Sequence, residues 1–324
     1  MLSFITANLI NYLHLHPLIT NFVPLIIKSM HKAGFVNIIG NPNVGKSTLM
    51  NALVGERISI ITSKSQTTRH RIMGIVNGDD FQIVYSDTPG VLKPNYRLQE
   101  SMLEASESAL TDADVLLYVT DTIETYNKNP EFLEKAKKSG IPTFLIINKI
   151  DLLPDQKALE DLVDMWHGVL PDARIVPICA REKFGLDNLL TQIKELLPEN
   201  PPYFDKDALT DRPARFFVTE IIREKILEIY DKEIPYSAEV VVEKFKEEGK
   251  IIHINAVIYV ERESQKGIII GKGGSMLKKT GMAARAEIET FFEKKVFLEL
   301  FVKVEKDWRS RDRQLKNFGY QLKD

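Results

Sequence analysis

The stretch Gly40-Asn41-Pro42-Asn43-Val44-Gly45-Lys46-Ser47 decides the fold of the first half of this 324-residue chain. It has the spacing G-x-x-x-x-G-K-[ST], follows an apolar run at 35–39 and precedes an amphipathic run at 48–54. Strand, glycine-rich loop and helix in this order predict backbone N–H groups that surround a phosphate at the positive end of a helix. We expect Lys46 to reach the β- and γ-phosphates and the Ser47 hydroxyl to bind Mg²⁺.

The composition is typical of a soluble globular protein. Its 324 residues suffice for two domains that each bury a core, with 27% charged and 44% hydrophobic residues. The formal net charge is -2, so any surface for nucleic acid must be local. A single cysteine, Cys179, excludes an internal disulfide and fits a reducing compartment.

The first 29 residues differ from the rest of the chain. They are apolar, but no Lys or Arg precedes Lys28, so the basic start of a secretory signal is missing. Histidines and prolines between positions 14 and 24 interrupt the run of about 20 apolar residues that a membrane span needs. We therefore expect residues 1–32 to be a disordered extension or a segment upstream of a natural start at Met30.

Apolar runs and helical stretches alternate from residue 33 to residue 200. The runs lie at 81–85, 115–119, 143–147 and 174–178, and helical patterns at 130–139 and 157–166 separate the last three. Continuous apolar strands that alternate with helices predict an α/β domain, here a P-loop NTPase G domain with a doubly wound, mostly parallel sheet. Ligands bind at the carboxyl ends of the strands in such a sheet.

A different pattern begins after the prolines at 198, 201 and 202. Residues 201–212 are polar and are expected to form a linker. From 213 to 324 we expect a helix at 217–230, strands at 238–245 and 252–260, a glycine-interrupted helical stretch at 266–292 and a strand at 296–304. The order helix, strand, strand, helix, helix, strand predicts a second, α+β domain.

Two motifs follow strand ends on the ligand side of the first sheet. After the strand at 81–85, Asp87-Thr88-Pro89-Gly90 is expected to hold a Mg²⁺ water through Asp87 and a γ-phosphate oxygen through the Gly90 N–H. Asn148-Lys149-Ile150-Asp151 closes the strand at 143–147. Its aspartate can accept both the ring N–H and the exocyclic amine of guanine, an arrangement that adenine lacks. The motifs together predict GTP and disfavour a phosphoryl-transferring kinase.

Smaller features complete the predicted nucleotide site. Cys179-Ala180-Arg181 ends the last strand, where the Ala180 N–H is expected to meet the guanine oxygen. In the segment 63–69 we expect Thr68, with Thr67 as the alternative, to close over Mg²⁺ when a γ-phosphate is present. The expected nucleotide-binding residues are Gly40, Asn41, Asn43, Val44, Gly45, Lys46, Ser47, Thr48, Asp87, Thr88, Gly90, Asn148, Lys149, Asp151 and Ala180.

One position departs from the Ras pattern. Val91 follows Gly90 where Ras-type enzymes carry a water-orienting glutamine, and an aliphatic side chain cannot position water by hydrogen bonding. We therefore expect slow intrinsic hydrolysis, with Asn43 as a ligand for a monovalent cation, K⁺, beside the phosphates. The catalytic residues we expect are Lys46, Thr68 and Asn43, and the magnesium ligands are Ser47, Thr68, Thr67 and Asp87.

A second glycine-rich loop, Gly271-Lys272-Gly273-Gly274, lies between two predicted helices of the second half. In a type II KH domain such a G-x-x-G loop clamps a single-stranded backbone while bases lie against an apolar groove. Basic residues around it form a local cluster in a chain of near-neutral balance. We expect RNA contacts from Lys266, Gly271, Lys272, Gly273, Gly274, Lys278, Lys279 and Arg285. We expect Phe291, Phe292 and Phe297 to lie in the core and not to act as stacking platforms.

From Met30 onward the chain resembles the Era family, bacterial GTPases with a C-terminal type II KH domain within the TrmE-Era-EngA-like superfamily. Beyond the motifs above, the resemblance is carried by Gln66-Thr67-Thr68-Arg69, Thr210-Asp211-Arg212-Pro213, Glu220-Ile221-Ile222-Arg223-Glu224-Lys225, Glu261-Arg262-Glu263 and the stretch 298–304. Departures from the family pattern are the stretch before Met30, Cys179 for the usual serine and the Gly273-Gly274 ending of the KH loop.

The resemblance implies a function that composition does not show. It implies a GTP-hydrolysing switch that binds the 3′ end of 16S rRNA and assists assembly of the 30S ribosomal subunit. It further implies a cytoplasmic monomer that associates peripherally with the inner membrane. The alternative is a GTP-controlled scaffold at the membrane surface whose KH-like domain binds protein or lipid.

Overall fold

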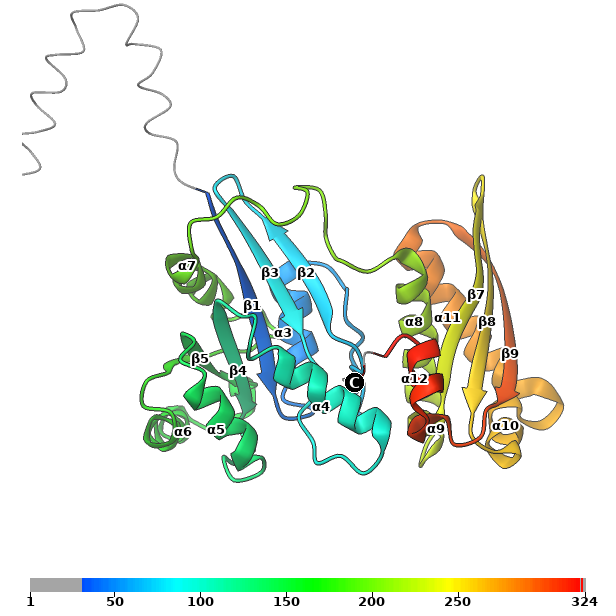
Figure 1. Ribbon diagram of the computed structural model, residues 1–324, viewed down its shortest axis with the longest axis horizontal. Helices are drawn as coiled ribbons and strands as arrows, with labels where there is room; N and C mark the ends of the chain where they lie inside the picture. Colours follow the sequence, from blue (N-terminus) through cyan, green and yellow to red (C-terminus); the bar gives the residue numbers. More distant parts are fainter. Residues whose placement is uncertain (1–30, 321, 323–324) are drawn as a thin grey trace, which may run out of the picture.

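The structure, a computed structural model, describes residues 31–320 and residue 322. Two sheets organise them, one six-stranded in the order β2-β3-β1-β4-β5-β6 and one three-stranded in the order β7-β8-β9. Figure 1 shows them as two domains side by side. Apart from its last two residues, the predicted extension 1–32 lies outside the described residues. No helix within the described ranges is long and apolar enough to cross a membrane.

The first domain alternates strands and helices as the sequence predicts. Its strands are β1 (Lys32–Gly40), β2 (Ile72–Asn77), β3 (Phe81–Asp87), β4 (Val115–Asp121), β5 (Thr143–Asn148) and β6 (Arg174–Pro177). Its helices are α3 (Lys46–Val54), α4 (Arg97–Ser108), α5 (Pro130–Lys138), α6 (Gln156–Val169) and α7 (Leu186–Leu196), with a short 3-10 turn at Ile150–Leu152. All strand pairs are parallel except β2 with β3. The prediction of a doubly wound, mostly parallel sheet is confirmed.

Helices cover both faces of this sheet. On one face α3 and α7 contribute Leu49 and Leu189 to a core shared with Val36 of β1. On the other face α5 and α6 contribute Phe132 and Trp166 to a second core. Because both faces are buried, the strands are continuously apolar, and the polar residues that follow them gather at the carboxyl edge.

Residues 201–212 pack along the edge of the first domain. The Ile75 N–H of β2 donates to the Leu209 carbonyl at 2.9 Å, and the Tyr203 N–H donates to the Gln82 side chain at 2.7 Å. The segment therefore covers backbone groups of β2 at a sheet edge that would otherwise stay unpaired. These bonds hold the segment that leads into the second domain in place against the first domain.

The second domain has the predicted order of helix, strand, strand, helix, helix, strand. Its elements are α8 (Ala214–Ile229), α9 (Ile234–Ser237), β7 (Glu239–Glu248), β8 (Ile251–Val260), α10 (Glu263–Ile270), the 3-10 turn η2 (Lys272–Gly274), α11 (Ser275–Phe292) and β9 (Lys295–Val304). Strand β8 pairs antiparallel with β7 and parallel with β9. Ile222 of α8 and Ala284 of α11 share a core with Ile258 of β8.

The chain ends in a segment that contacts both domains. The 3-10 turn η3 (Trp308–Ser310) and α12 (Asp312–Asn317) follow β9 and lie between the domains in Figure 1. Trp308 and Leu315 pack against Leu98 of α4, and the Trp308 indole donates to the Ser237 carbonyl at 3.0 Å. The C-terminal segment thus connects α4 of the first domain to the second domain.

The prediction that Phe291, Phe292 and Phe297 lie in the core is wrong for Phe291, which is 38% exposed, and for Phe297. Phe292 is partly buried and packs against the core of the second domain. Phe297 is 51% exposed and Phe301, four residues along β9, is 48% exposed, whereas the neighbouring Val296 is buried. Successive side chains of a strand point to opposite faces, so the helix-covered face takes Val296 and the open face takes Phe297 and Phe301.

Candidate nucleotide and nucleic-acid sites

A cavity of about 610 Å³ lies at the carboxyl edge of the first sheet. Its walls come from the phosphate loop and the start of α3, the segment 60–68, Gly90 and Lys149. The structure thus brings the glycine-rich loop, the segment that follows α3 and two of the motifs predicted to bind GTP around one space.

Lys46 is buried at the floor of this cavity. Its residue exposure is 6%, and the Nζ donates to the Asn41 carbonyl at 2.8 Å. Burial lowers the pKa of Lys46 to about 8, although Asp87 and Glu124 act in the opposite direction. An ammonium held in this way gains most from an anionic phosphate, because the phosphate restores favourable interactions for its charged form.

Three oxygen-bearing side chains meet beside Lys46. Ser47 Oγ donates to Asp87 Oδ2 at 2.7 Å and lies 2.9 Å from Thr68 Oγ1, which lies 3.4 Å from the same carboxylate oxygen. The other oxygen, Asp87 Oδ1, is buried without a hydrogen-bond partner among the described residues. Burial raises the pKa of Asp87 despite the nearby Lys46. Hard oxygen donors and an unpartnered carboxylate oxygen fit Mg²⁺.

Thr67, the alternative magnesium ligand, is placed differently from Thr68. The Thr67 hydroxyl donates to the Lys64 carbonyl at 2.6 Å and lies 2.7 Å from Thr62 Oγ1. Its hydroxyl is engaged within its own segment, whereas Thr68 reaches Ser47 and Asp87.

Asn148 joins the predicted guanine loop to the phosphate loop. Its Nδ2 donates to the Val44 carbonyl at 2.9 Å, and its Oδ1 accepts the Ala180 N–H at 3.0 Å. A single side chain therefore connects the ends of β5 and β6 with the loop after β1.

The remaining guanine-side residues form a second set of contacts. Lys149 Nζ donates to the Asn43 carbonyl at 2.7 Å and to Asp121 Oδ2 at 2.6 Å, and Asp151 is exposed. Cys179 Sγ donates to Asp151 Oδ1 at 2.9 Å. Burial raises the pKa of Cys179, so the thiol keeps its proton and orients the carboxylate. Asp121 belongs to no motif in the sequence, and its only signal there is its position at the end of β4.

Val91 points away from the cavity. Its side chain is buried in the core with Ile39, and its N–H donates to the Gly40 carbonyl at 3.2 Å. Thr88 is held by a bond from its hydroxyl to the Ile38 carbonyl at 2.7 Å. The Asn43 side chain instead reaches toward the segment 63–69, donating to the Ser63 carbonyl at 3.3 Å.

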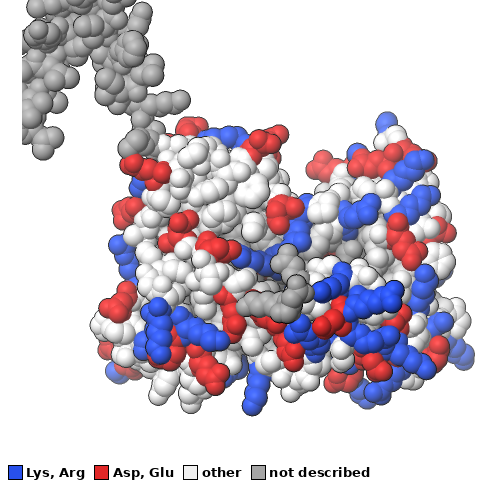
Figure 2. Space-filling view, in the orientation of Figure 1, with Lys and Arg blue, Asp and Glu red and all other residues white. Residues whose placement is uncertain are grey.

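The G-x-x-G loop of the second domain is exposed between α10 and α11. Lys272, Lys278 and Lys279 are exposed, and Arg285 pairs with Glu289 at 3.1 Å. Ile268 and Met282, on the two flanking helices, are 52% and 65% exposed and give the surface apolar character. Figure 2 shows basic side chains gathered over the lower right of the second domain, where Figure 1 places α10, with acidic ones among them.

Two family models match the chain. Residues 35–149 match a family described as 50S ribosome-binding GTPase, and residues 233–309 match a KH domain. The chain is 48% identical over 294 residues to GTPase Era of Syntrophus aciditrophicus, covering 90% of this chain and 96% of the relative. It is 46% identical to GTPase Era of Alkaliphilus metalliredigens, again over 90% of this chain.

Solved structures match over both domains. The structure of Era in complex with MgGDPNP and nucleotides 1506–1542 of 16S ribosomal RNA superposes with a TM-score of 0.87 at 40% identity, covering 90% of this chain and all of that one. A variant of Aquifex aeolicus Era bound to GDP and AlF4⁻ gives a TM-score of 0.86 with the same coverage. In each case one superposition includes the nucleotide domain and the KH domain together.

Proposed function

The chain belongs to the Era family of GTPases, and we propose that it uses GTP hydrolysis to time its binding to the 3′ end of 16S rRNA during assembly of the 30S subunit. The observation that carries this proposal is the match of both domains, in one superposition, to Era bound to MgGDPNP and 16S rRNA nucleotides. The geometry of the two sites supports it independently.

The nucleotide chemistry follows from the residues around the cavity. Lys46 binds the phosphates, Ser47, Thr68 and Asp87 hold Mg²⁺, and Asp151 recognises guanine. When bound, the magnesium ion would supply positive charge that stabilises the negative charge of the phosphates during transfer. Because Val91 is buried in the core, its side chain cannot orient the attacking water. Asn43, whose side chain reaches the segment 63–69, would hold a potassium ion, which would supply positive charge in place of an arginine finger.

The RNA chemistry belongs to the loop 271–274 and its surroundings. Exposed lysines neutralise phosphates, and the apolar surface of Ile268 and Met282 accepts unstacked bases. The protein acts as a cytoplasmic monomer that contacts the inner membrane peripherally.

The decisive experiment measures GTP turnover and RNA binding in the full chain. Ser47→Ala removes a predicted magnesium ligand and should lower kcat by at least about 100-fold. A single-stranded RNA from the 16S 3′ end should bind the wild-type protein with different affinities in the GTP-analogue and GDP states, and by reciprocity the RNA should change nucleotide affinity.

Two outcomes would contradict the proposal. Unchanged turnover in Ser47→Ala would remove the assigned metal site. RNA affinity that is absent, or equal in both nucleotide states, would remove the timing role, and binding to anionic liposomes in its place would favour a scaffold at the membrane surface.

A further inference from the structure

Three consecutive residues that follow α3 face alternately toward the two domains. The Thr67 carbonyl faces the second domain, the Thr68 hydroxyl faces Ser47 and Asp87, and the Arg69 side chain faces the second domain again. The residue that approaches the magnesium position is thus flanked on both sides by anchors in the other domain.

The anchor before Thr68 comes from α8. Arg223, 1% exposed, donates through its guanidinium to the Thr67 carbonyl and, at 3.4 Å, to the Gln66 carbonyl. The same guanidinium is paired with Glu220 on its own helix through bonds of 2.9 and 2.6 Å. Burial alone would raise the pKa of Glu220, but Arg223 lowers it below its ordinary value, so the pair is ionised.

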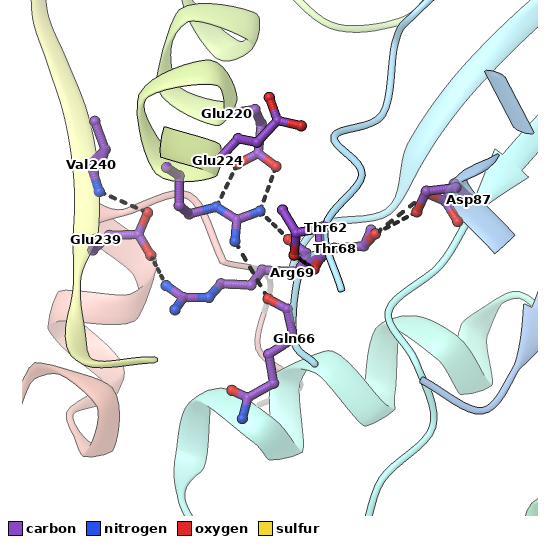
Figure 3. A network of polar contacts seen from close by, with 12 residues as sticks. Thr62, Gln66, Thr68, Arg69, Asp87, Glu220, Glu224, Glu239 and Val240 are labelled. Carbon is purple, nitrogen blue, oxygen red and sulfur yellow. Dashed lines mark hydrogen bonds and ion pairs between the residues drawn. The ribbon is translucent and has the colours of Figure 1, made fainter. Parts of the chain in front are cut away.

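The anchor after Thr68 is Arg69, a side chain of the first domain that donates to acceptors of the second domain. Arg69, also 1% exposed, donates to the Ala238 carbonyl at 2.8 Å, the Pro235 carbonyl at 3.1 Å and Glu239 Oε2 at 3.0 Å. Figure 3 shows Arg69 directed toward Glu239 at the start of β7, while Thr68 lies on the side of Asp87. Each domain therefore inserts one buried arginine among backbone carbonyls of the other.

We propose that Arg223 and Arg69 form a reciprocal arginine clamp, in which Arg223 of the second domain is a positioning residue that holds Thr68 for Mg²⁺ and the γ-phosphate. The inference rests on the proposed GTPase function and adds to it the route by which the RNA-binding domain reaches the reaction. When the clamp is closed, the second domain completes the nucleotide site; when the domains separate, the segment 63–69 is released.

The charges explain why the clamp can open. Arg223 and Glu220 are both on α8, so they remain paired when the domains separate and the bonds to the Gln66 and Thr67 carbonyls break. Separation therefore leaves neither charge without a partner. The Gln66 and Thr67 carbonyls exchange protein donors for water, which costs little. At the other end Arg69 and Glu239 part and both become hydrated.

The relatives support the direction of the effect. This chain superposes over both domains on Era bound to MgGDPNP and on Era bound to GDP and AlF4⁻. GDPNP is a GTP analogue, and AlF4⁻ bound together with GDP mimics the γ-phosphate. The domain arrangement that carries the clamp here therefore matches that of Era with such ligands, and we expect the clamp to favour the GTP state over the GDP state.

The test is Arg223→Lys in the full chain. Lysine keeps a positive charge for Glu220 but cannot donate in parallel to two carbonyls. We expect single-turnover kcat and affinity for a non-hydrolysable GTP analogue each to fall by about 10-fold, with GDP affinity within about twofold of wild type. Thr68 acts only when a γ-phosphate is present, so a general loss of structure would not produce this split.

The matched control is Arg57→Lys. Arg57 also crosses between the domains, to Glu224 of α8 and Glu287 of α11, but makes no bond to the segment 63–69. Arg57→Lys should leave the ratio of the affinities for the GTP analogue and for GDP unchanged. If Arg223→Lys does not fold, the double variant Glu220→Gln/Arg223→Gln, which removes both charges together, replaces it.

Two results would overturn the clamp. One is a wild-type kcat and affinity ratio in the Arg223 variant, and the other is an equal loss of GDP and analogue binding. Wild-type turnover is measured in the same assay, so absence of GTP hydrolysis in the unmodified chain would count against the proposed function and not against the clamp alone.

Discussion

The two glycine-rich loops of this protein have similar sequences but need glycine for different reasons. Gly45 of the phosphate loop has φ 97°, and a Cβ there would lie 2.2 Å from the Asn148 amide nitrogen. Gly273 of the KH loop has φ 58°, and a Cβ there would meet nothing within 4 Å. At Gly45 the packing of the protein itself excludes a side chain. At Gly273 the space beside the backbone is open, so a ligand can approach the backbone closely.

This difference indicates how each loop binds its ligand. The phosphate loop is tied to β5 and β6 through Asn148 before any nucleotide arrives, so it is preorganised. The KH loop presents an exposed lysine in η2, two more on α11 and an open backbone, which suits a flexible single strand.

The largest effect is expected where packing is closest. Gly45→Ala would displace Asn148 and so break the connection between the guanine loop and the Val44 carbonyl. Affinity for GTP and for GDP should both fall by at least about 100-fold, measured with fluorescent nucleotides. Gly55→Ala is the matched control, because Gly55 also has a positive φ of 85° but has no atom within 4 Å of its Cβ position.

The control separates packing from backbone strain. Gly55→Ala should cost about 1–2 kcal/mol of folding stability, as any alanine at positive φ does, while nucleotide affinity stays at the wild-type value. If both alanine variants bound GTP equally well, the argument that contact with Asn148 fixes the phosphate loop would be wrong.

A smaller and more selective effect is expected in the KH loop. Gly273→Asp has room for its side chain and an αL conformation that aspartate tolerates, but it adds negative charge where an RNA phosphate would lie. Affinity for a 16S 3′-end RNA should fall by about 10- to 100-fold in a filter-binding assay, with GTP affinity and melting temperature unchanged.

Gly249→Asp is the control in the same domain. Gly249 has φ 61° and nothing within 4 Å of its Cβ position, but it lies in the β7–β8 turn, outside the loop 271–274. RNA affinity should survive this change. Equal losses in the two variants would show that net charge alone weakens binding, and the loop would lose its assigned role.

The sequence predicts these two loops well and the contacts between the two domains poorly. A phosphate loop is recognisable because strand, glycine spacing and helix are consecutive in the chain. The bond from Arg223 to Thr67 joins residues 156 positions apart. No local sequence pattern at either residue indicates that the two are in contact. Buried arginines also resemble surface arginines in a sequence, since burial depends on a partner elsewhere in the chain.

The misplacement of Phe297 has a comparable cause. An aromatic residue in an apolar run usually indicates a core, but a strand in a one-sided sheet has two faces, and the period alone does not say which one helices will cover. Val296 and Phe297 are adjacent and equally apolar, yet only the first is buried. In the segment 201–212, polarity likewise did not reveal that its backbone bonds β2.

His70 lies at the boundary between the two domains, and its charge state should affect the free energy of unfolding. The His70 ring stacks on Tyr320 of the C-terminal segment, with centroids 4.4 Å apart, and meets the edge of Phe216 near the start of α8 at 5.8 Å. It follows Arg69 directly, so it belongs to the same boundary between the domains as the clamp.

The smallest predicted effect is a pH dependence at this boundary. Burial lowers the pKa of His70 from 6.5 to about 4. The carboxylates of Glu220 and Glu239 act in the opposite direction, and the guanidinium groups of Arg223 and Arg212 lower the pKa further. The unfolded chain therefore binds more protons between pH 4 and 6.5, and stability should decrease as pH falls through that window. Relative to His70→Phe, which keeps a ring between Tyr320 and Phe216, the wild type should lose about 1 kcal/mol of unfolding free energy between pH 7.5 and 5.5 in urea titrations. Parallel pH dependences in the two proteins would mean that His70 is hydrated in the folded state and that the domains do not exclude water from this ring.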